Sequence, residues 1–484
     1  MLVTIMEVLD MTIVNVALPQ MMGNLGATAD QITWVLTAYI VSSAIIMPLN
    51  GLLVQRFGRR GLLLTCIVGF GITSACCGLA TSLTPLVIFR LLQGVFGATL
   101  VPLSQYIISE TFPEEERNKA FAIWGIGIMV APVFGPSIGG YITEFFSWRA
   151  IFYLNIPVCI LAFFMCMSSI PESTRTPVYV DKFGLLLLVL GIGCLQLFLD
   201  HGNEFDWLQS NLIIILMAVS FVGLGWFITR GLHNPKNLIT MDLFYNRNFT
   251  VSTLILSLAC MGMFGLMALQ PLMLEQLMEY PVIFSGIIMG PRGVACALSM
   301  MFLGAAGNRI NLIKATVYGL ILLSLGCFLS TNFTINTPWQ PIALAGAIQG
   351  FGMGLLFVPL STLALVTLKP NQVAEAMGIF SFGRNIGGSV GIAILGTTLY
   401  RHTQINWQEL ASHVSSSGAA QWLSNSPLGN LATMKILSFE VQKQAAMIAF
   451  NNCHLLLAII FLLLIPLTFL LKSPRADQAP IMAH

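Results

Sequence analysis

The sequence predicts an all-α integral membrane protein that crosses the bilayer fourteen times. Hydrophobic residues make up 56% of its 484 residues and charged residues only 9%, against roughly 25% charged residues in soluble domains. Fourteen apolar runs are long enough to cross a membrane as helices, which takes about 20 residues each. In addition, part of the sequence occurs twice. A soluble fold is therefore excluded, and a net charge of +2 gives no reason to expect a nucleic-acid partner.

The repeat predicts the domain organisation. The Pro-Leu-Ser stretch at 102–104 returns 257 residues later at 359–361, and a Gln-Gly pair precedes each copy, at 93–94 and 349–350. Internal repeats are typical of secondary transporters, which bind substrate between two related halves. We therefore expect two six-helix halves with two helices inserted between them. The expected boundaries are 1–170 for the N-terminal half, 171–235 for the inserted helices and 236–484 for the C-terminal half.

The basic residues beside the apolar runs predict the topology. If the N-terminus is cytoplasmic, fifteen of the 22 Lys and Arg residues lie at cytoplasmic ends of spans, four lie outside and three lie within spans. This excess places both termini in the cytoplasm. The first run has neither a basic segment nor a cleavage site, so we expect a retained helix and not a signal peptide. The predicted spans are 2–22, 34–54, 61–81, 85–106, 118–141, 149–169, 183–199, 211–229, 249–270, 282–303, 313–331, 340–366, 375–400 and 452–471.

One predicted external segment is much longer than a connector. Residues 401–451 are polar and rich in Ser and Asn, with a helical stretch near 431–450. Connections longer than about 12–15 residues are uncommon in compact domains unless they are functional or disordered. Two interpretations stay open: a docking or gating element on the periplasmic side, or a solvated loop.

The run at 85–106 contains a single charged residue, Arg90. A charge at the centre of a bilayer costs about 2.5–3.5 kcal/mol on insertion scales, so a functional role is the default interpretation. We expect a carboxylate partner for Arg90. The first span supplies two candidates, Glu7 and Asp10, which lie three residues apart and therefore on one helical face.

Two carboxylates one turn apart do not both ionise cheaply. We expect Glu7 and Asp10 to titrate as a unit and to hold one proton near neutral pH, as a proton-coupled carrier requires. The alternative is that Glu7 lies at the cytoplasmic interface of a short helix, whereas Asp10 lies too deep to reach either headgroup layer. The candidate proton-coupling residues are Asp10, Glu7 and Arg90.

Two glycine-containing segments are expected to control how the helices move. Segment 51–60 follows the second span at the cytoplasmic surface, where a glycine permits a tight turn and arginines can pair with carboxylates or lipid phosphates. Segment 135–140 in the fifth span combines a kink with small residues that let another helix approach closely. We assign conformational or gating roles to Gly51, Arg56, Gly58, Arg59, Gly135, Pro136, Gly139 and Gly140.

Other chemistry is less well supported. The stretch 387–391 matches the serine-hydrolase pattern G-x-S-x-G around Ser389, but it lies inside a predicted helix and not at a strand-to-helix turn. Nine of the ten cysteines lie in apolar runs, which favours packing roles over disulfides, and no metal-binding spacing is present. We expect a protein that is not an enzyme and holds neither a metal nor a cofactor.

These segments together resemble the major facilitator superfamily, specifically its fourteen-helix drug:proton antiporter branch of the EmrB and QacA type. Residues 9–19, LDMTIVNVALP, resemble the first-helix signature of that branch, and 51–60 resembles the conserved cytoplasmic loop. Arg90 with its Gln-Gly pair resembles the fourth-helix proton-transfer motif, and 135–140 resembles the antiporter motif. Residues 195–207, LQLFLDHGNEFDW, and the long loop before the last helix are most similar to the EmrB type.

The resemblance implies a major facilitator fold and multidrug efflux of amphiphilic compounds, with antibiotic resistance as its consequence. It also implies that a proton gradient drives transport without a cofactor. The EmrB type implies a cell inner membrane location, an EmrA-like periplasmic adaptor and a TolC-like outer-membrane channel. Two residues depart from the family pattern. Gln55 replaces an aspartate of the loop motif, which weakens the expected charge lock between the halves, and Ala131 replaces a glycine of the antiporter motif.

The sequence does not name the substrate. Its 24 Met and 32 Phe favour a wide, apolar and adaptable cavity, as promiscuous binding requires. Two alternatives to efflux stay open: a proton-coupled symporter for a small nutrient, and an intramembrane hydrolase that depends on Ser389. The residues assigned to the substrate cavity are Asn15, Gln93, Trp124, Phe264, Phe380 and Arg384.

Overall fold

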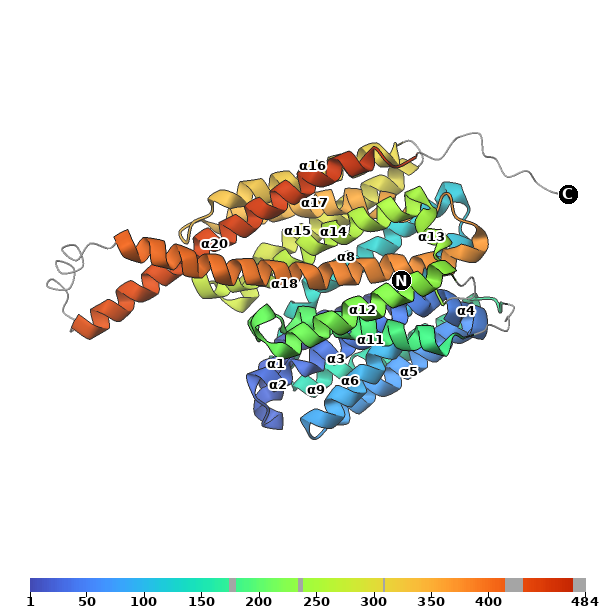
Figure 1. Ribbon diagram of the computed structural model, residues 1–484, viewed down its shortest axis with the longest axis horizontal. Coiled ribbons are helices and arrows are strands. Elements are labelled where there is room, and N and C mark those ends of the chain that lie inside the picture. Colours follow the sequence, from blue (N-terminus) through green and yellow to red (C-terminus); the bar gives the residue numbers. More distant parts are fainter. Residues whose placement is uncertain (174–179, 234–237, 308–309, 414–429, 473–484) are drawn as a thin grey trace.

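The computed structural model describes residues 1–173, 180–233, 238–307, 310–413 and 430–472, and in these ranges every regular element is helical. Thirteen of the described helical stretches are long and apolar enough to cross a membrane. The remaining predicted span, 118–141, lies within α8 (Glu114–Phe145), a helix of 32 residues. The long helices lie roughly parallel in Figure 1. The prediction of an all-α integral membrane protein is confirmed.

The first part of the chain builds α1 to α10. Several predicted spans are each made of two consecutive helices; for example, the Met-Pro-Leu turn η1 joins α3 to α4. Gly58, with a φ of 72°, ends α4 and lets α5 start in a new direction, because a positive φ is unstrained only in glycine. The bounds are α1 Leu2–Leu25, α2 Ala29–Ile32, α3 Trp34–Ile46, η1 Met47–Leu49, α4 Asn50–Phe57, α5 Arg59–Leu79, α6 Leu83–Gly97, α7 Leu100–Thr111, α9 Trp148–Tyr153 and α10 Asn155–Ser169.

The next segment forms two antiparallel helices, α11 (Lys182–His201) and α12 (Asn211–His233), with the short turn η2 (Trp207–Gln209) between them. The outer face of α12 is apolar and exposed, including Phe221 and Trp226, as expected for a surface that faces lipid. The other face of the pair is attached to both sides of the molecule, because α11 contacts α3 and also α18 (Val373–His413). The two helices lie within 171–235, the segment expected to be inserted, and the division of the chain into halves stays a prediction.

The last part of the chain repeats the pattern of the first. In Figure 1 the helices from α14 to α20 gather on one side of the molecule, and α1 to α6 gather on the other. Within this part, α14 packs along α18, and both α15 and α16 pack on α17. Across the two parts, α8 packs against α15. The bounds are α13 Asp242–Tyr245, α14 Arg247–Leu272, η3 Met273–Leu277, α15 Val282–Ala306, α16 Leu312–Leu329, η5 Ser330–Asn332, α17 Trp339–Leu363, η6 Pro370–Gln372 and α20 Asn430–Thr468.

The prediction for 401–451 is confirmed in its helical stretch near 431–450, which belongs to α20, and is wrong for 401–413, which continue α18. Helix α18 has 41 residues and is therefore about 60 Å long, roughly twice the thickness of the bilayer's hydrocarbon core. Helix α20 begins at Asn430 and packs against it, so that the two helices project together beyond the rest of the molecule (Figure 1). Residues 414–429 lie outside the described part of the chain.

The start of α20 is weakly amphipathic, and the protein covers its apolar face. Ala445 is buried, Leu437 and Val441 are half-buried, and Lys435 and Gln442 are exposed. Contact with α18 provides the cover, including a hydrogen bond from Asn406 Nδ2 to the Ala445 carbonyl (3.2 Å). The extension of α18 over 401–413 was missed because polar helical residues give no hydropathy signal.

Candidate proton-coupling and substrate site

Asp10 lies at the centre of a buried polar network on the N-terminal side of the molecule. Its Oδ2 accepts a hydrogen bond from Arg90 Nη1 at 2.6 Å, which is also an ion pair. Its Oδ1 accepts from Asn155 Nδ2 at 2.7 Å and from Gln93 Nε2 at 3.2 Å. The side chains of Asp10 and Arg90 are each only 1% exposed. The carboxylate partner that the sequence predicts for Arg90 is therefore Asp10.

Further hydrogen bonds and a contact with an aromatic ring position the Arg90 side chain, in addition to its ion pair with Asp10. Its Nε donates to the Val35 carbonyl (3.1 Å), and its Nη1 also donates to Gln93 Oε1 (2.9 Å). The guanidinium lies over the ring of Tyr39, 4.4 Å from the centroid. A buried ion pair is tolerated only when additional hydrogen bonds satisfy its remaining donors and acceptors, and this network supplies them. Helices α1, α3, α6 and α10 meet at these residues.

Glu7 has a different environment, although it lies one turn from Asp10. Its Oε1 accepts a single long hydrogen bond from the Tyr39 hydroxyl (3.5 Å), and its buried Oε2 has no hydrogen-bond partner among the described residues. Glu7 interacts electrostatically with Asp10 and with Arg384 of α18. The side chain is buried inside the protein, so a position at the headgroup interface is not supported. That the two carboxylates titrate as one unit stays a prediction.

Three residues of this network were not predicted. Asn155 bridges Asp10 and Ser74, donating to Ser74 Oγ at 3.0 Å, and Tyr39 contacts both Glu7 and Arg90. Asn155 carries a usable signal, because it is a polar amide in an otherwise apolar run, IFYLNIPV. Ser74 and Tyr39 carry none, since serine and tyrosine are common in transmembrane helices.

The residues assigned to the substrate cavity do not form one cluster. Gln93 is engaged by Asp10 and Arg90, and Asn15 is exposed on α1. Trp124 of α8 is buried, donates to Thr4 Oγ1 (3.1 Å) and stacks on Phe357. The other three assigned residues come from the C-terminal side: Phe264 lies beside Gly388, Phe380 is buried in the core, and Arg384 makes no hydrogen bond within the described residues.

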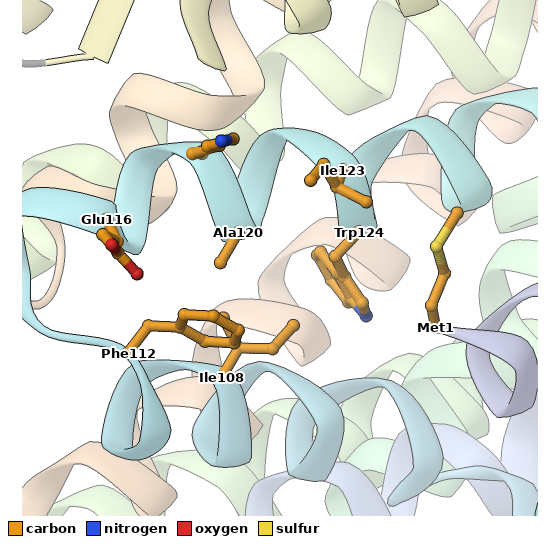
Figure 2. A pocket seen from close by; sticks show the side chains of 8 residues that line it. Met1, Ile108, Phe112, Glu116, Ala120, Ile123 and Trp124 are labelled. Carbon is orange, nitrogen blue, oxygen red and sulfur yellow. The ribbon is translucent and has the colours of Figure 1, made fainter. Parts of the chain in front are cut away.

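One cavity of about 350 Å³ opens between α7, α8 and the start of α1. Figure 2 shows apolar side chains such as Ile108, Phe112 and Ile123 around it, with the Glu116 carboxylate near one end and Trp124 and Met1 near the other. Of the assigned cavity residues, only Trp124 lines this cavity. Its apolar walls, with the acidic Glu116 and the basic Lys119 among the lining residues, suit an amphiphilic molecule.

The two sides of the molecule are in contact near the start of α18. Asn50 Nδ2 donates to the Ala374 carbonyl at 2.8 Å. A Cβ added to Gly51 would lie 2.6 Å from the Glu375 Cβ, so only glycine permits this approach of α4 to α18. Glu375 is fixed from the other side by the backbone NH and hydroxyl of Thr240. Gln55 is exposed, so this contact of α4 with α18 uses Asn50 and Gly51 and does not need the missing aspartate.

The other gating residues occupy two places. Arg59 pairs with Glu110 of α7, whereas Arg56 is exposed and lies over the ring of Phe57. In α8, a Cβ at Gly135 would overlap Thr12, and one at Gly139 would lie 2.7 Å from Ile13 Cγ1. Gly140 has more room, and the side chain of Pro136 lies outside the described residues. The predicted close approach of another helix to 135–140 is confirmed, and that helix is α1.

The fold and this buried network define a multi-pass membrane transporter. Residues 1–392 match the Major Facilitator Superfamily, and the chain belongs to that family. Among curated proteins it is similar to the multidrug export protein EmrB of Haemophilus influenzae, with 34% identity over 99% of this chain and 95% of that protein. It is equally similar to the fatty acid resistance protein FarB of Neisseria gonorrhoeae, with 34% identity over 98% of this chain and 95% of that protein.

Solved structures support the same fold. The human organic anion transporter MFSD10 superposes with a TM-score of 0.58 over 95% of this chain and 98% of that chain, at 15% identity. The proton:xylose symporter XylE superposes with a TM-score of 0.59 over 95% and 93% of the two chains, at 13% identity. The family consists of transporters and not enzymes, so the hydrolase alternative is rejected. Ser389 lies inside α18 and accepts a hydrogen bond from Gln196 (2.8 Å).

Proposed function

We propose that the protein is a proton-driven exporter of amphiphilic compounds that works by alternating access. The observation that carries the proposal is the buried Asp10–Arg90 pair with its hydrogen bonds from Gln93 and Asn155. A carboxylate at membrane depth that is paired with an arginine from another helix can bind or release a proton when the helices move, because the arginine stabilises the charged form only while it is close. Asp10 is the main proton carrier and Glu7 modulates it.

The repeated helices move as two units in this proposal. The N-terminal half (1–170) and the C-terminal half (236–484) rock about the space between them, while the inserted helices (171–235) accompany both through α11. The contact of Asn50 and Gly51 with α18 closes one end of the pathway. The excess of Lys and Arg at that end supports a cytoplasmic location for it and for both termini.

The test is Asp10→Asn in inverted membrane vesicles with an acidic interior, where export is measured as uptake of a fluorescent amphiphile into the vesicle. We expect normal amounts of protein in the membrane and loss of proton-driven transport, because the amide keeps the size of the side chain but can neither ionise nor carry the transported proton. Glu7→Gln should only shift the pH optimum. Asp30→Asn, on an exposed residue of α2, is the matched control and should transport normally. Retained coupled transport in Asp10→Asn would reject this residue as the carrier, and proton-driven movement in the opposite direction would identify a nutrient symporter.

Multidrug export is the substrate range that we propose. The relatives at 34% identity are named for multidrug export and for fatty acid resistance. The apolar cavity between α7 and α8, with Glu116 near its end, suits entry of such compounds. A growth screen of expressing cells against drugs and fatty acids, with Asp10→Asn cells as the reference, measures the range directly.

The projecting hairpin of α18 and α20 supports a further part of the proposal, a tripartite pump in the cell inner membrane. Its surface carries exposed apolar side chains, including Ile405 (57% exposed) and Phe439 (60% exposed). An EmrA-like periplasmic adaptor that leads to a TolC-like outer-membrane channel would cover such residues. Replacing 408–430 by a short Gly/Ser linker should then lower efflux from whole cells while transport in proteoliposomes persists; equal loss in both assays would mean that the hairpin gates the carrier.

A further inference from the structure

The C-terminal half contains a second buried arginine that pairs with a glutamine. Arg292 is the eleventh residue of α15, about 15 Å from the start of the helix and therefore near the middle of a bilayer. Its side chain is only 4% exposed. Its Nη2 donates to Gln349 Oε1 of α17 at 2.7 Å. Nothing in the proposed transport mechanism uses this residue.

This pair repeats the arrangement around Arg90. Gln349 belongs to the Gln-Gly pair that repeats Gln93-Gly94, and each glutamine contacts a cysteine of a neighbouring helix: Gln349 contacts Cys327, and Gln93 contacts Cys77. Arg90 lies three residues before Gln93, and the residue three before Gln349 is Gly346. Gly346 has no side chain, and the side chain of Arg292 from α15 fills the space beside it. The Arg292 Cβ and Nε lie 3.8 and 3.9 Å from the position that a Cβ on Gly346 would take. The two halves therefore present a guanidinium in the same relation to the repeated glutamine.

The two arginines differ in whether a carboxylate pairs with them. Arg90 donates three hydrogen bonds, one of them to the Asp10 carboxylate. Arg292 donates one, and its buried Nε and Nη1 have no hydrogen-bond partner within the described residues. Helices α14, α15, α16 and α17 contain no Asp or Glu at all. The polar groups near Arg292 include the Cys327 thiol, which accepts a hydrogen bond from Gln349, and His454 of α20, and neither is a carboxylate.

We propose that Arg292 is a binding site for the carboxylate of an anionic amphiphile. A buried guanidinium without an anion is strongly disfavoured, and a carboxylate would restore the charge balance that Asp10 provides in the other half. Nη2 has two hydrogens and Gln349 takes one, so the guanidinium still offers a two-pronged edge, the geometry that a carboxylate matches. A small inorganic anion would have to lose its hydration at this depth, whereas an amphiphile brings an apolar tail suited to the surroundings.

This inference rests on the proposed function, since it assigns a substrate class to the exporter, but its test measures binding without a proton gradient. The purified full-length protein in an uncharged detergent is titrated with radiolabelled decanoate, and decanol and sodium chloride serve as competitors. We expect decanoate to bind at least about tenfold more tightly than decanol, the discrimination typical of one charge-assisted hydrogen-bonding group. Equal competition by the alcohol, or displacement of decanoate by chloride at similar concentration, would overturn the proposal.

Variants locate the site. Arg292→Gln should weaken decanoate binding by roughly 10- to 100-fold and leave decanol unaffected. Arg230→Gln is the control, because Arg230 of α12 pairs with Asp181 and has no part in the proposed transport or binding sites. Loss of binding in Arg230→Gln but not in Arg292→Gln would overturn the assignment. If Arg292→Gln does not fold, Arg292→Lys can replace it. Lysine keeps the positive charge but lacks the planar guanidinium group, so this variant should bind decanoate more weakly than the wild type.

The experiments can reject the Arg292 binding site without rejecting the proposed export mechanism, and the reverse. Proton-driven efflux of a cationic dye by Arg292→Gln, together with lost decanoate binding, would support both. Decanoate binding that is unchanged in Arg292→Gln would reject the site while Asp10→Asn still decides the export mechanism.

Discussion

Replacing Arg90 by lysine separates the charge of this residue from its shape. Lysine keeps one positive charge near Asp10 but lacks the planar guanidinium group. Its ammonium therefore cannot also reach the Val35 carbonyl and Gln93 Oε1. Each hydrogen bond to a charged group contributes about 1.5–3 kcal/mol, and the ammonium recovers part of the two that are lost. We therefore expect Arg90→Lys to lose about 2–4 kcal/mol of stability and still insert in the membrane.

The decisive measurement is the pH dependence of efflux. The lysine ammonium meets the Asp10 carboxylate in a different geometry, so we expect the pH profile of efflux to change. Arg230→Lys is the matched control, because Arg230 also forms a two-pronged pair with a carboxylate, donating from Nε and Nη2 to Asp181 at 2.9 and 3.3 Å, but it does so outside the network. A profile that is unchanged in Arg90→Lys would show that Arg90 is a structural residue.

Two further predictions concern the gate and a surface ion pair. Gly51→Leu should abolish transport, because the leucine side chain prevents α4 from approaching Glu375 of α18. Gln105 of α7 accepts a hydrogen bond from Ser381 of α18, so a cysteine introduced at Gln105 should become more reactive to maleimides when α18 moves away. Unchanged reactivity would contradict the proposed closure. The guanidinium of Arg230 holds the pKa of Asp181 below its usual value, so the stability from this pair is present above the unfolded-state pKa of about 4 and is lost as the pH falls through the lower native pKa. Arg230→Gln should therefore lower the melting temperature at pH 7. The difference in melting temperature between the variant and the wild type should disappear at acidic pH.

The membrane architecture and the Asp10–Arg90 pair were predictable because burial of charge in a bilayer leaves a clear sequence signal. An arginine and a carboxylate in apolar runs have few partners to choose from. Side chains that are polar only by one hydroxyl or amide, such as Ser74 and Asn155, pack wherever the helices meet, and their contacts depend on the angle between α1, α5 and α10. The contact of Asn50 with Ala374 was likewise unpredictable, since it joins two segments 324 residues apart.

The sequence predicts a carboxylate partner for Arg90 alone, and the structure shows that the three arginines within spans differ. Arg90 donates three hydrogen bonds, one of them to a carboxylate, Arg292 donates one to a glutamine, and Arg384 makes none within the described residues.

Glu7 and Asp10 lie one turn apart on α1, but their neighbours differ. Asp10 accepts hydrogen bonds from Arg90 and Gln93 of α6 and from Asn155 of α10. Glu7 accepts one long hydrogen bond from Tyr39, and its Oε2 has no hydrogen-bond partner among the described residues. A change at Asp10 therefore disturbs the packing of α1 against α6 and α10, whereas a change at Glu7 leaves the Asp10–Arg90 pair in place. For this reason we expect Glu7→Gln to be the milder of the two substitutions.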